Sequence, residues 1–126
     1  HDACGESIRR ARAFFPRYFP DRPFKAVTCV SWICDNQLPH LLGEASNLSR
    51  FQAEMHLYPV GGGGHSIYLH LFGGVPEKVD DLPRDNRLFR AIVEHVKRGG
   101  RWRRGGALLL PDDFDWGRQV YRRYEA

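Results

Sequence analysis

The chain has 126 residues, of which 42% are hydrophobic and 27% are charged. This composition is typical of one soluble globular domain with a buried core, and it excludes a fibrous or disordered chain. No apolar run approaches the roughly 20 residues that a membrane-spanning helix needs. We therefore expect a single domain over residues 1–126 that does not enter a membrane. Because the sequence begins at His1 and not at a methionine, we treat it as a candidate piece of a longer protein with an N-terminal partner domain.

The net charge of +4 at pH 7 comes mainly from arginines. A basic surface attracts phosphate-bearing ligands, and these include nucleic acids, nucleotide cofactors and coenzyme A. Charge alone does not choose among them. The arginines fall into an early and a late group: Arg9, Arg10, Arg12, Arg17 and Arg22, then Arg98, Arg101, Arg103, Arg104, Arg118, Arg122 and Arg123.

The three cysteines are too few and too widely spaced for a disulfide framework or a zinc cage. Cys29 and Cys34 are five positions apart, so on one extended strand their side chains would face opposite ways and could not bridge. Reduced thiols in the cytoplasm are the simplest interpretation.

The first predicted element is an amphipathic helix over residues 3–19, with Asp2 as its N-cap. Pro16 should kink or end it. Its apolar stripe is Ile8, Ala11, Phe15, Tyr18 and Phe19.

A long strand is predicted from Phe24 to Asp35, because this stretch has almost no charge and many β-branched and aromatic residues. We expect it to be the central strand of the sheet, with both faces covered. On one face the side chains become small at Cys29 and Ser31, which leaves room for a cleft. The alternative is a plain core strand with an inert cysteine.

The middle of the chain predicts a short helix from Asn36 to Gly43 and a polar bend from Ser46 to Arg50. A hairpin should follow, with strands Phe51 to Val60 and His65 to Phe72 joined by four glycines. The glycines could instead cradle a phosphate, but such a cradle needs a helix N-terminus after it, and the sequence favours a strand there.

The last third predicts a helix that is capped by Asp85 or Asn86 and ends at Lys97, where glycines follow. A strand from Trp102 to Leu110 and a short helix from Trp116 to Tyr124 complete the chain; the role of residues 111–126 is open. The predicted order is α-β-α-β-β-α-β-α, an α+β fold with a mixed, largely antiparallel sheet flanked by helices.

Several kinds of site are disfavoured by the sequence. The six histidines lack a metal-binding spacing, so we expect no metal. No Gly-x-Ser-x-Gly nucleophile elbow occurs, and no nearby cation would activate Cys29 as a nucleophile. Most aromatic residues occupy core spacings, which disfavours a nucleic-acid stacking platform.

Several motifs together resemble one bacterial family, the GNAT-like C-terminal domain of acyltransferase-domain proteins. The similarity runs to about Leu110, although the Gln/Arg-x-x-Gly-x-Gly/Ala pyrophosphate loop of ordinary GNAT enzymes is absent. The motifs are Ser7-x-x-x-Ala11-x-x-Phe14-Phe15-x-x-x-Phe19-Pro20, Cys29-Val30-Ser31-Trp32-x-x-Asp35-x-x-Leu38, Ser46-Asn47-x-x-x-Phe51-Gln52, Phe72-Gly73, Leu82-Pro83-Arg84-Asp85 and Gly99-Gly100-x-Trp102-Arg103.

The resemblance implies a GNAT-like fold, an acyl-CoA co-substrate and an amine acceptor, with an acyltransferase-like domain on the N-terminal side. In such a reaction the amine attacks the thioester directly, and the protein supplies position, a proton acceptor and an oxyanion donor. Ser31 and Asn47 are the candidate catalytic residues, and Trp32, Arg50 and Arg84 are the candidate binding residues. Capping and turn bonds are the competing role for Ser31 and Asn47, and a salt bridge to Asp81 is the competing role for Arg84.

Two other functions remain open at this point. One is a binding or interaction domain that keeps the fold without catalysis, and the other is a basic nucleic-acid-binding module. The second would bind mainly through charge and without base-reading contacts, so we consider nucleic acid a poor candidate partner.

Overall fold

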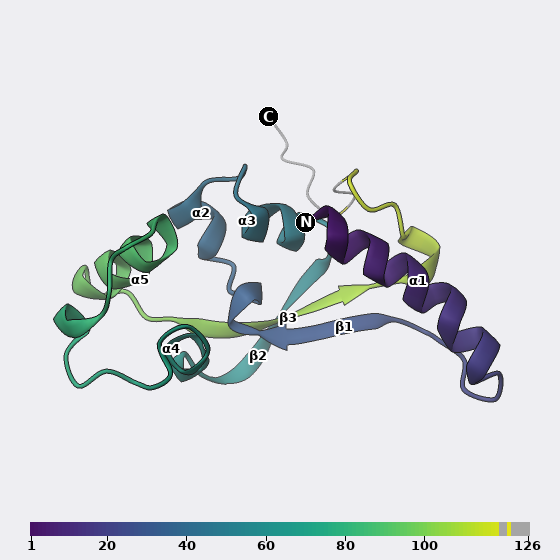
Figure 1. Cartoon of the computed structure of the whole chain (residues 1–126), viewed down its shortest axis with the longest axis horizontal. Helices are drawn as coiled ribbons and strands as arrows, with labels where there is room; N and C mark the ends of the chain where they lie inside the picture. The colour runs from purple at the N-terminus through teal and green to yellow at the C-terminus, as the bar shows by residue number, and fades with distance from the viewer. Residues whose placement is uncertain (119–120, 122–126) are drawn as a thin grey trace.

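The fold is built on a small antiparallel sheet. The computed structural model describes residues 1–118 and 121. Within this part of the chain, the strands β1 (Val27–Ser31), β2 (His56–Gly63) and β3 (Arg103–Leu109) form one sheet in the order β1-β3-β2 (Figure 1). Helices pack around it, so the α+β class with an antiparallel sheet is confirmed.

The central strand of the sheet is β3. The sequence had indicated the first strand in this position, and that prediction is wrong. β1 pairs only with β3 among the described residues, and it covers only Val27–Ser31 of the predicted strand Phe24–Asp35. The strand ends because the Ser31 hydroxyl accepts a hydrogen bond from the backbone of Ile33 and begins the short 3-10 helix η1 (Trp32–Cys34). The strand from Trp102 to Leu110 is confirmed as β3.

The predicted hairpin is wrong in its second half. The segment after the glycines is a helix, α4 (His65–Phe72), and not a strand. Its apolar residues Ile67, Leu71, Tyr68 and Phe72 pack together against one core cluster. These two pairs have the i,i+4 spacing that places residues on one helix face, so packing decides against the strand preference of the local sequence.

Two short helices connect β1 to β2. The predicted helix after Asn36 is confirmed as α2 (Leu38–Leu42). The predicted polar bend is instead α3 (Asn47–Ala53), which extends into what was expected to be strand. Its N-cap is Ser46, whose hydroxyl accepts from the backbone N–H of Ser49 at 3.1 Å.

The remaining helices largely follow the sequence pattern. The first helix is α1 (Asp2–Tyr18), which has Pro16 in its last turn and His1, not Asp2, at its N-cap position. The helix α5 (Arg87–Lys97) is capped by Asn86, as expected. Two 3-10 turns, η2 (Val79–Asp81) and η3 (Pro111–Asp113), complete the fold. The predicted helix from Trp116 to Tyr124 falls largely outside the described residues.

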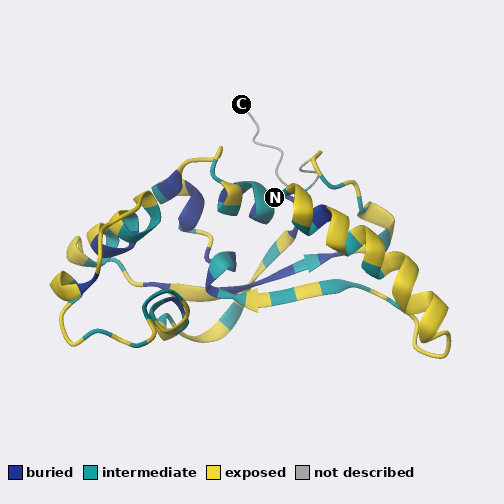
Figure 2. Ribbon diagram, in the orientation of Figure 1, coloured by how far each residue is buried: buried dark blue, intermediate teal, exposed yellow. Residues whose placement is uncertain are grey.

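Two hydrophobic clusters hold these elements together. Figure 2 shows how far the residues along each element are buried. The first brings η1, α2, α4 and α5 against the start of β3, and the second packs β3 against α1 and the end of η1. Their buried members are Trp32, Leu38, Leu42, Ile67, Ile92 and Trp102 in the first and Cys34, Met55, Ala107 and Leu109 in the second.

Only the first half of α1 packs on the second cluster, through Ile8. Toward its C-terminal end, Phe15 and Tyr18 of the predicted apolar stripe are 42% and 56% exposed, and Phe19 just beyond is 45% exposed. This end of the helix extends past β1 (Figure 1). The stripe is therefore a core contact at one end and an open aromatic surface at the other.

Candidate functional site

The pairing of β2 with β3 is interrupted near the end of the sheet. Pro59 pairs with Gly105, and the next register pair is Gly63 with Arg103. Three residues of β2, Val60 to Gly62, therefore lie opposite the single residue Arg104. This is a β-bulge, which bends the strand away from its partner.

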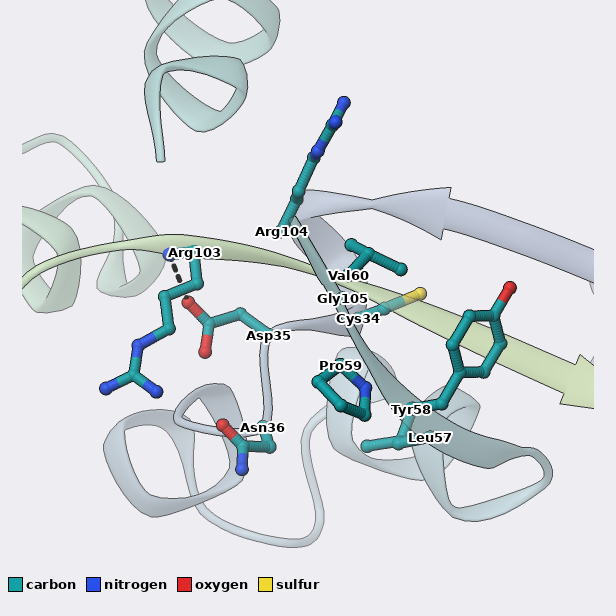
Figure 3. A pocket seen from close by; sticks show the side chains of 10 residues that line it. All are labelled: Cys34, Asp35, Asn36, Leu57, Tyr58, Pro59, Val60, Arg103, Arg104 and Gly105. Carbon is teal, nitrogen blue, oxygen red and sulfur yellow. Dashed lines mark hydrogen bonds between the residues drawn. The ribbon is translucent and has the colours of Figure 1, made fainter. Parts of the chain in front are cut away.

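A cavity of about 320 Å³ lies at this bulge (Figure 3). We call it the β2–β3 cavity. Its wall is partly apolar, from Leu57, Pro59 and Val60, and partly polar, from residues at the end of η1 and the start of β3. The complete lining is Cys34, Asp35, Asn36, Leu57, Tyr58, Pro59, Val60, Arg103, Arg104 and Gly105.

The carboxylate of Asp35 fixes one wall of the cavity. The residue is 2% exposed. One carboxylate oxygen accepts from the backbone and the side-chain amide of Gln37, both at 3.0 Å, and the other accepts from the backbone N–H of Arg103 at 2.8 Å. The side-chain amide of Gln52 also donates to the Asp35 carbonyl at 2.8 Å. A buried carboxylate with several donors is stable, and here it ties η1 to β3.

Two glycines of β3 allow the close packing that shapes the cavity. A Cβ atom on Gly105 would lie 2.1 Å from the carbonyl oxygen of Cys34, and one on Gly106 would lie 2.2 Å from the ring of Tyr58. The ring of Tyr58 therefore lies directly over the backbone of β3. Glycine inside a strand is a known sign of such a close approach, so these two glycines are the signal in the sequence from which the site could have been found.

Two arginines bring positive charge to the cavity. The side chains of Arg103 and Arg104 extend in opposite directions, as neighbouring residues on a strand do (Figure 3). Nε of Arg104 donates to the carbonyl oxygen of Gly61 at 2.8 Å, so this guanidinium lies beside the glycine run. Within the described residues, neither guanidinium forms an ion pair with an acidic side chain, and both arginines are exposed.

The glycine run itself leads into a helix. Gly64 is the N-cap residue of α4, and Gly62 has a φ of +115° that favours glycine. The sequence had favoured a strand after the glycines, and this was the argument against a phosphate cradle. Because the helix α4 follows the glycines, backbone amides at a helix N-terminus come directly after them. The argument against a phosphate cradle therefore no longer holds.

Two of the five predicted site residues lie near the end of β1. Ser31 caps η1 and pairs with Gly105, so it is next to the cavity but does not line it. Trp32 is 8% exposed and belongs to the first hydrophobic cluster, where it cannot wall an open cleft.

The other three predicted residues lie on other elements. Asn47 is the exposed first residue of α3, and Arg50 is a half-buried residue of the same helix. Arg84 is exposed and donates to Asp80 at 2.9 Å, not to the expected Asp81, and Lys97 contacts the same carboxylate. The five residues therefore do not gather in one site. The lining residues Asn36, Tyr58, Arg103 and Arg104 were not among the candidates.

The described part of the chain also bears on two other kinds of site, a metal site and a membrane-spanning helix. No group of three or more histidine, cysteine or acidic side chains is placed to hold a metal ion there. Among the same residues, no helix combines the length and the apolar character that crossing a membrane requires.

Comparison with known proteins identifies the family. The family model of the GNAT-like C-terminal domain matches residues 1–109, so the chain belongs to this family. Comparison with curated proteins gives no match.

Solved structures of acyltransferases share the fold. An acyltransferase in complex with decanoyl-CoA is 31% identical, with a TM-score of 0.78 over 87% of this chain and 35% of that chain. An acyltransferase in complex with CoA and 10C-teicoplanin is 30% identical, with a TM-score of 0.76 over 86% of this chain and 36% of that chain. The chain thus spans about a third of the length of these acyltransferases, and its fold is GNAT-like.

Proposed function

We propose that this chain is the GNAT-like domain of an N-acyltransferase that takes its acyl group from acyl-CoA. The observation that supports it most is the similarity, at 30–31% identity, to acyltransferases whose structures contain CoA or decanoyl-CoA. The basic, partly apolar β2–β3 cavity is consistent with this donor, because acyl-CoA combines phosphates with an acyl chain.

The thioester is assigned to the β2–β3 cavity. Val60 to Gly62 have no register partner on β3, so the bulge can turn backbone N–H groups toward a carbonyl oxygen that becomes negatively charged. Tyr58 carries the one hydroxyl among the residues that line the cavity, and this hydroxyl can give a proton to the departing CoA thiolate (Figure 3). Leu57 and Val60 would contact the first carbons of the acyl chain.

The phosphates of CoA are assigned to the start of α4. The guanidinium of Arg104 contacts Gly61 within the bulge, and the first amides of α4 follow the bulge along the chain, after Gly64. Helix amides and arginine are the usual partners of phosphate. Arg84 and Arg50, the earlier candidates, stay predictions for the outer part of the cofactor.

The acceptor is proposed to be an amine that enters from the side of a second domain. One similar acyltransferase is in complex with decanoyl-CoA and teicoplanin, and this chain covers only 36% of it. We infer that residues beyond this domain complete the acceptor site and exclude water. Ser31 and Asn47 stay predictions for contacts with the amine.

Calorimetric titration of the chain with CoA and with decanoyl-CoA tests the proposal. We expect saturable binding of both, with tighter binding of decanoyl-CoA because its chain buries apolar surface. Arg104→Ala should weaken the binding of both by about tenfold, the loss of one charged hydrogen bond. Arg98→Ala is the matched control, because Arg98 forms an exposed pair with Glu94 on α5. Absence of binding, or equal losses in both variants, would contradict the assignment and favour a domain without a CoA site.

A further inference from the structure

The cysteines of β1 and η1 lie together, contrary to the sequence prediction. That prediction placed Cys29 and Cys34 on opposite faces of one strand. Because the strand ends at Ser31 and η1 turns the chain, the Cys34 sulfur comes back to 3.8 Å from the carbonyl oxygen of Cys29. Cys29 also packs against the hydrophobic cluster that contains Cys34.

The two thiols differ in their surroundings. Cys34 is 2% exposed and lines the β2–β3 cavity, whereas Cys29 is half-buried. Burial raises the pKa of Cys34 from 9.0 to about 12, and the charge of the neighbouring Cys29 and a hydrogen bond between the two side chains add to the rise. Both side chains lie in the same hydrophobic cluster, and the Cys34 sulfur contacts the backbone of Cys29.

We propose that Cys29 and Cys34 form a disulfide when the protein meets a small-molecule disulfide. The Cys29 thiolate attacks one sulfur of the small disulfide, which releases one thiolate and leaves a mixed disulfide on Cys29. Cys34 passes its proton to the released thiolate, and its sulfur then attacks the Cys29 sulfur. The second small thiolate leaves and takes up the proton that Cys29 lost. Two electrons pass from the protein to the small disulfide, which departs as two thiols.

The order of attack follows from exposure. Cys29 is the thiol that solvent can reach, so it reacts first. Once Cys29 is in the mixed disulfide, it no longer carries a thiolate charge. One of the causes that disfavour the Cys34 thiolate is then removed.

Cys4 is the competing partner for Cys29. It lies on α1, and its pKa is raised by burial and, to a smaller degree, by the charge of Cys29. The carbonyl oxygen of Cys29 contacts the Cys34 sulfur, and only five positions separate the two residues along the chain. The geometry therefore favours Cys34 as the second cysteine of the bridge.

The bridge would also change the β2–β3 cavity. The Cys34 sulfur is part of its wall (Figure 3). Because Cys29 lies on β1, a bond between the two would draw that sulfur toward β1. This consequence for ligand binding rests on the proposed function, whereas the bridge itself does not.

Peptide mapping after treatment with oxidised glutathione tests the proposal. Trypsin cuts after Lys25 and Arg50, so Cys29 and Cys34 fall in one peptide, residues 26–50, and Cys4 falls in another. We expect peptide 26–50 without alkylation and lighter by two hydrogen atoms, restored by reduction with dithiothreitol. A cross-link to the Cys4 peptide, a stable glutathione adduct on Cys29, or free thiols throughout would overturn the proposal.

Cysteine variants give the matched controls. Cys4→Ala should still form the bridge, and Cys29→Ala should not, with far-ultraviolet circular dichroism to check that each variant is folded. The wild-type chain treated in guanidinium shows whether the native turn matters. Bridging that is as fast and as selective in the unfolded chain would contradict an origin in the folded geometry. Binding of CoA to the oxidised protein is measured in a separate titration. If the protein does not bind CoA, the peptide-mapping result on the disulfide still stands.

Discussion

The two sides of β3 are paired in different ways. On one side β1 follows an unbroken register from Val27 opposite Leu109 to Ser31 opposite Gly105. On the other side β2 stays in register only as far as Pro59 and then bulges. The β2–β3 cavity lies on the interrupted side. The regular pairing of β1 with β3 therefore stabilises the sheet, whereas the bulge in β2 makes room for a ligand.

The largest expected effect is at Gly105, where the two sides meet. Its added Cβ in Gly105→Ala would lie 2.1 Å from a backbone oxygen of Cys34, which cannot rotate away. We expect the free energy of unfolding to fall by about 3 kcal/mol or more, as overpacking against a fixed backbone does. Urea unfolding measures it.

Gly106→Ala is the matched comparison. Its Cβ meets the Tyr58 ring, and that side chain is 38% exposed and can swing into solvent. We expect a smaller loss of stability and a changed cavity. Equal losses for the two glycines would show that the interrupted side is as rigid as the regular side.

The next effect is expected at Asp35, whose carboxylate ties η1 to β3 on the cavity side. Asp35→Asn keeps the size but replaces an acceptor oxygen with a donor that faces other donors. We expect a loss of about 2 kcal/mol, the cost of unsatisfied buried polar groups. Glu44→Gln, at an exposed position on the loop after α2, is the control. Unfolding curves that coincide for the two variants would remove Asp35 from the framework of the cavity.

A smaller effect should appear in alkaline solution. The folded pKa of Cys34 is raised to about 12 from 9.0, so the folded protein holds this proton in a range of pH where the unfolded chain loses it. The stability from the neutral thiol is complete below pH 9 and is lost as the pH rises toward 12. Melting temperatures of the wild type and of Cys34→Ala across this range measure it. We expect the decline to be less steep in the variant, and parallel declines would contradict this origin.

The smallest effect is expected for Arg84→Ala, because this residue lies on the loop between η2 and α5 and belongs to neither side of β3. Its bridge to Asp80 is exposed, and Lys97 shares the same carboxylate, so the melting temperature should hardly change. CoA affinity then decides its role. A loss of affinity near that of Arg104→Ala would extend the site toward α5, and unchanged affinity would remove Arg84 from the candidates.

Helices with clear end signals could be predicted from the sequence. The cap at Asn86 and the glycines after Lys97 defined α5, and the spacing of Ile8 and Ala11 defined the packed half of α1. These signals act over a few residues, so they are present in the sequence whatever the rest of the fold does.

The sheet could not be predicted, because its strands pair over long distances. Nothing local shows that β3 lies between β1 and β2, or that Ile67 faces a core built from α2 and α5. For the same reason the lining residues were missed, since Tyr58 and Arg104 come from strands that meet only in the folded chain. The glycines at 105 and 106 were the one local sign.

The central position of β3 has a consequence for synthesis of the protein. Within the described chain, β1 and β2 each hydrogen-bond to β3 and not to each other. While a ribosome makes the chain in order, these two strands have no partner in the sheet until Arg103–Leu109 has emerged. Their apolar residues stay open to other chains for most of that time. Folding of this sheet is therefore a late event on the ribosome, and chaperones that shield unpaired strands should affect its yield.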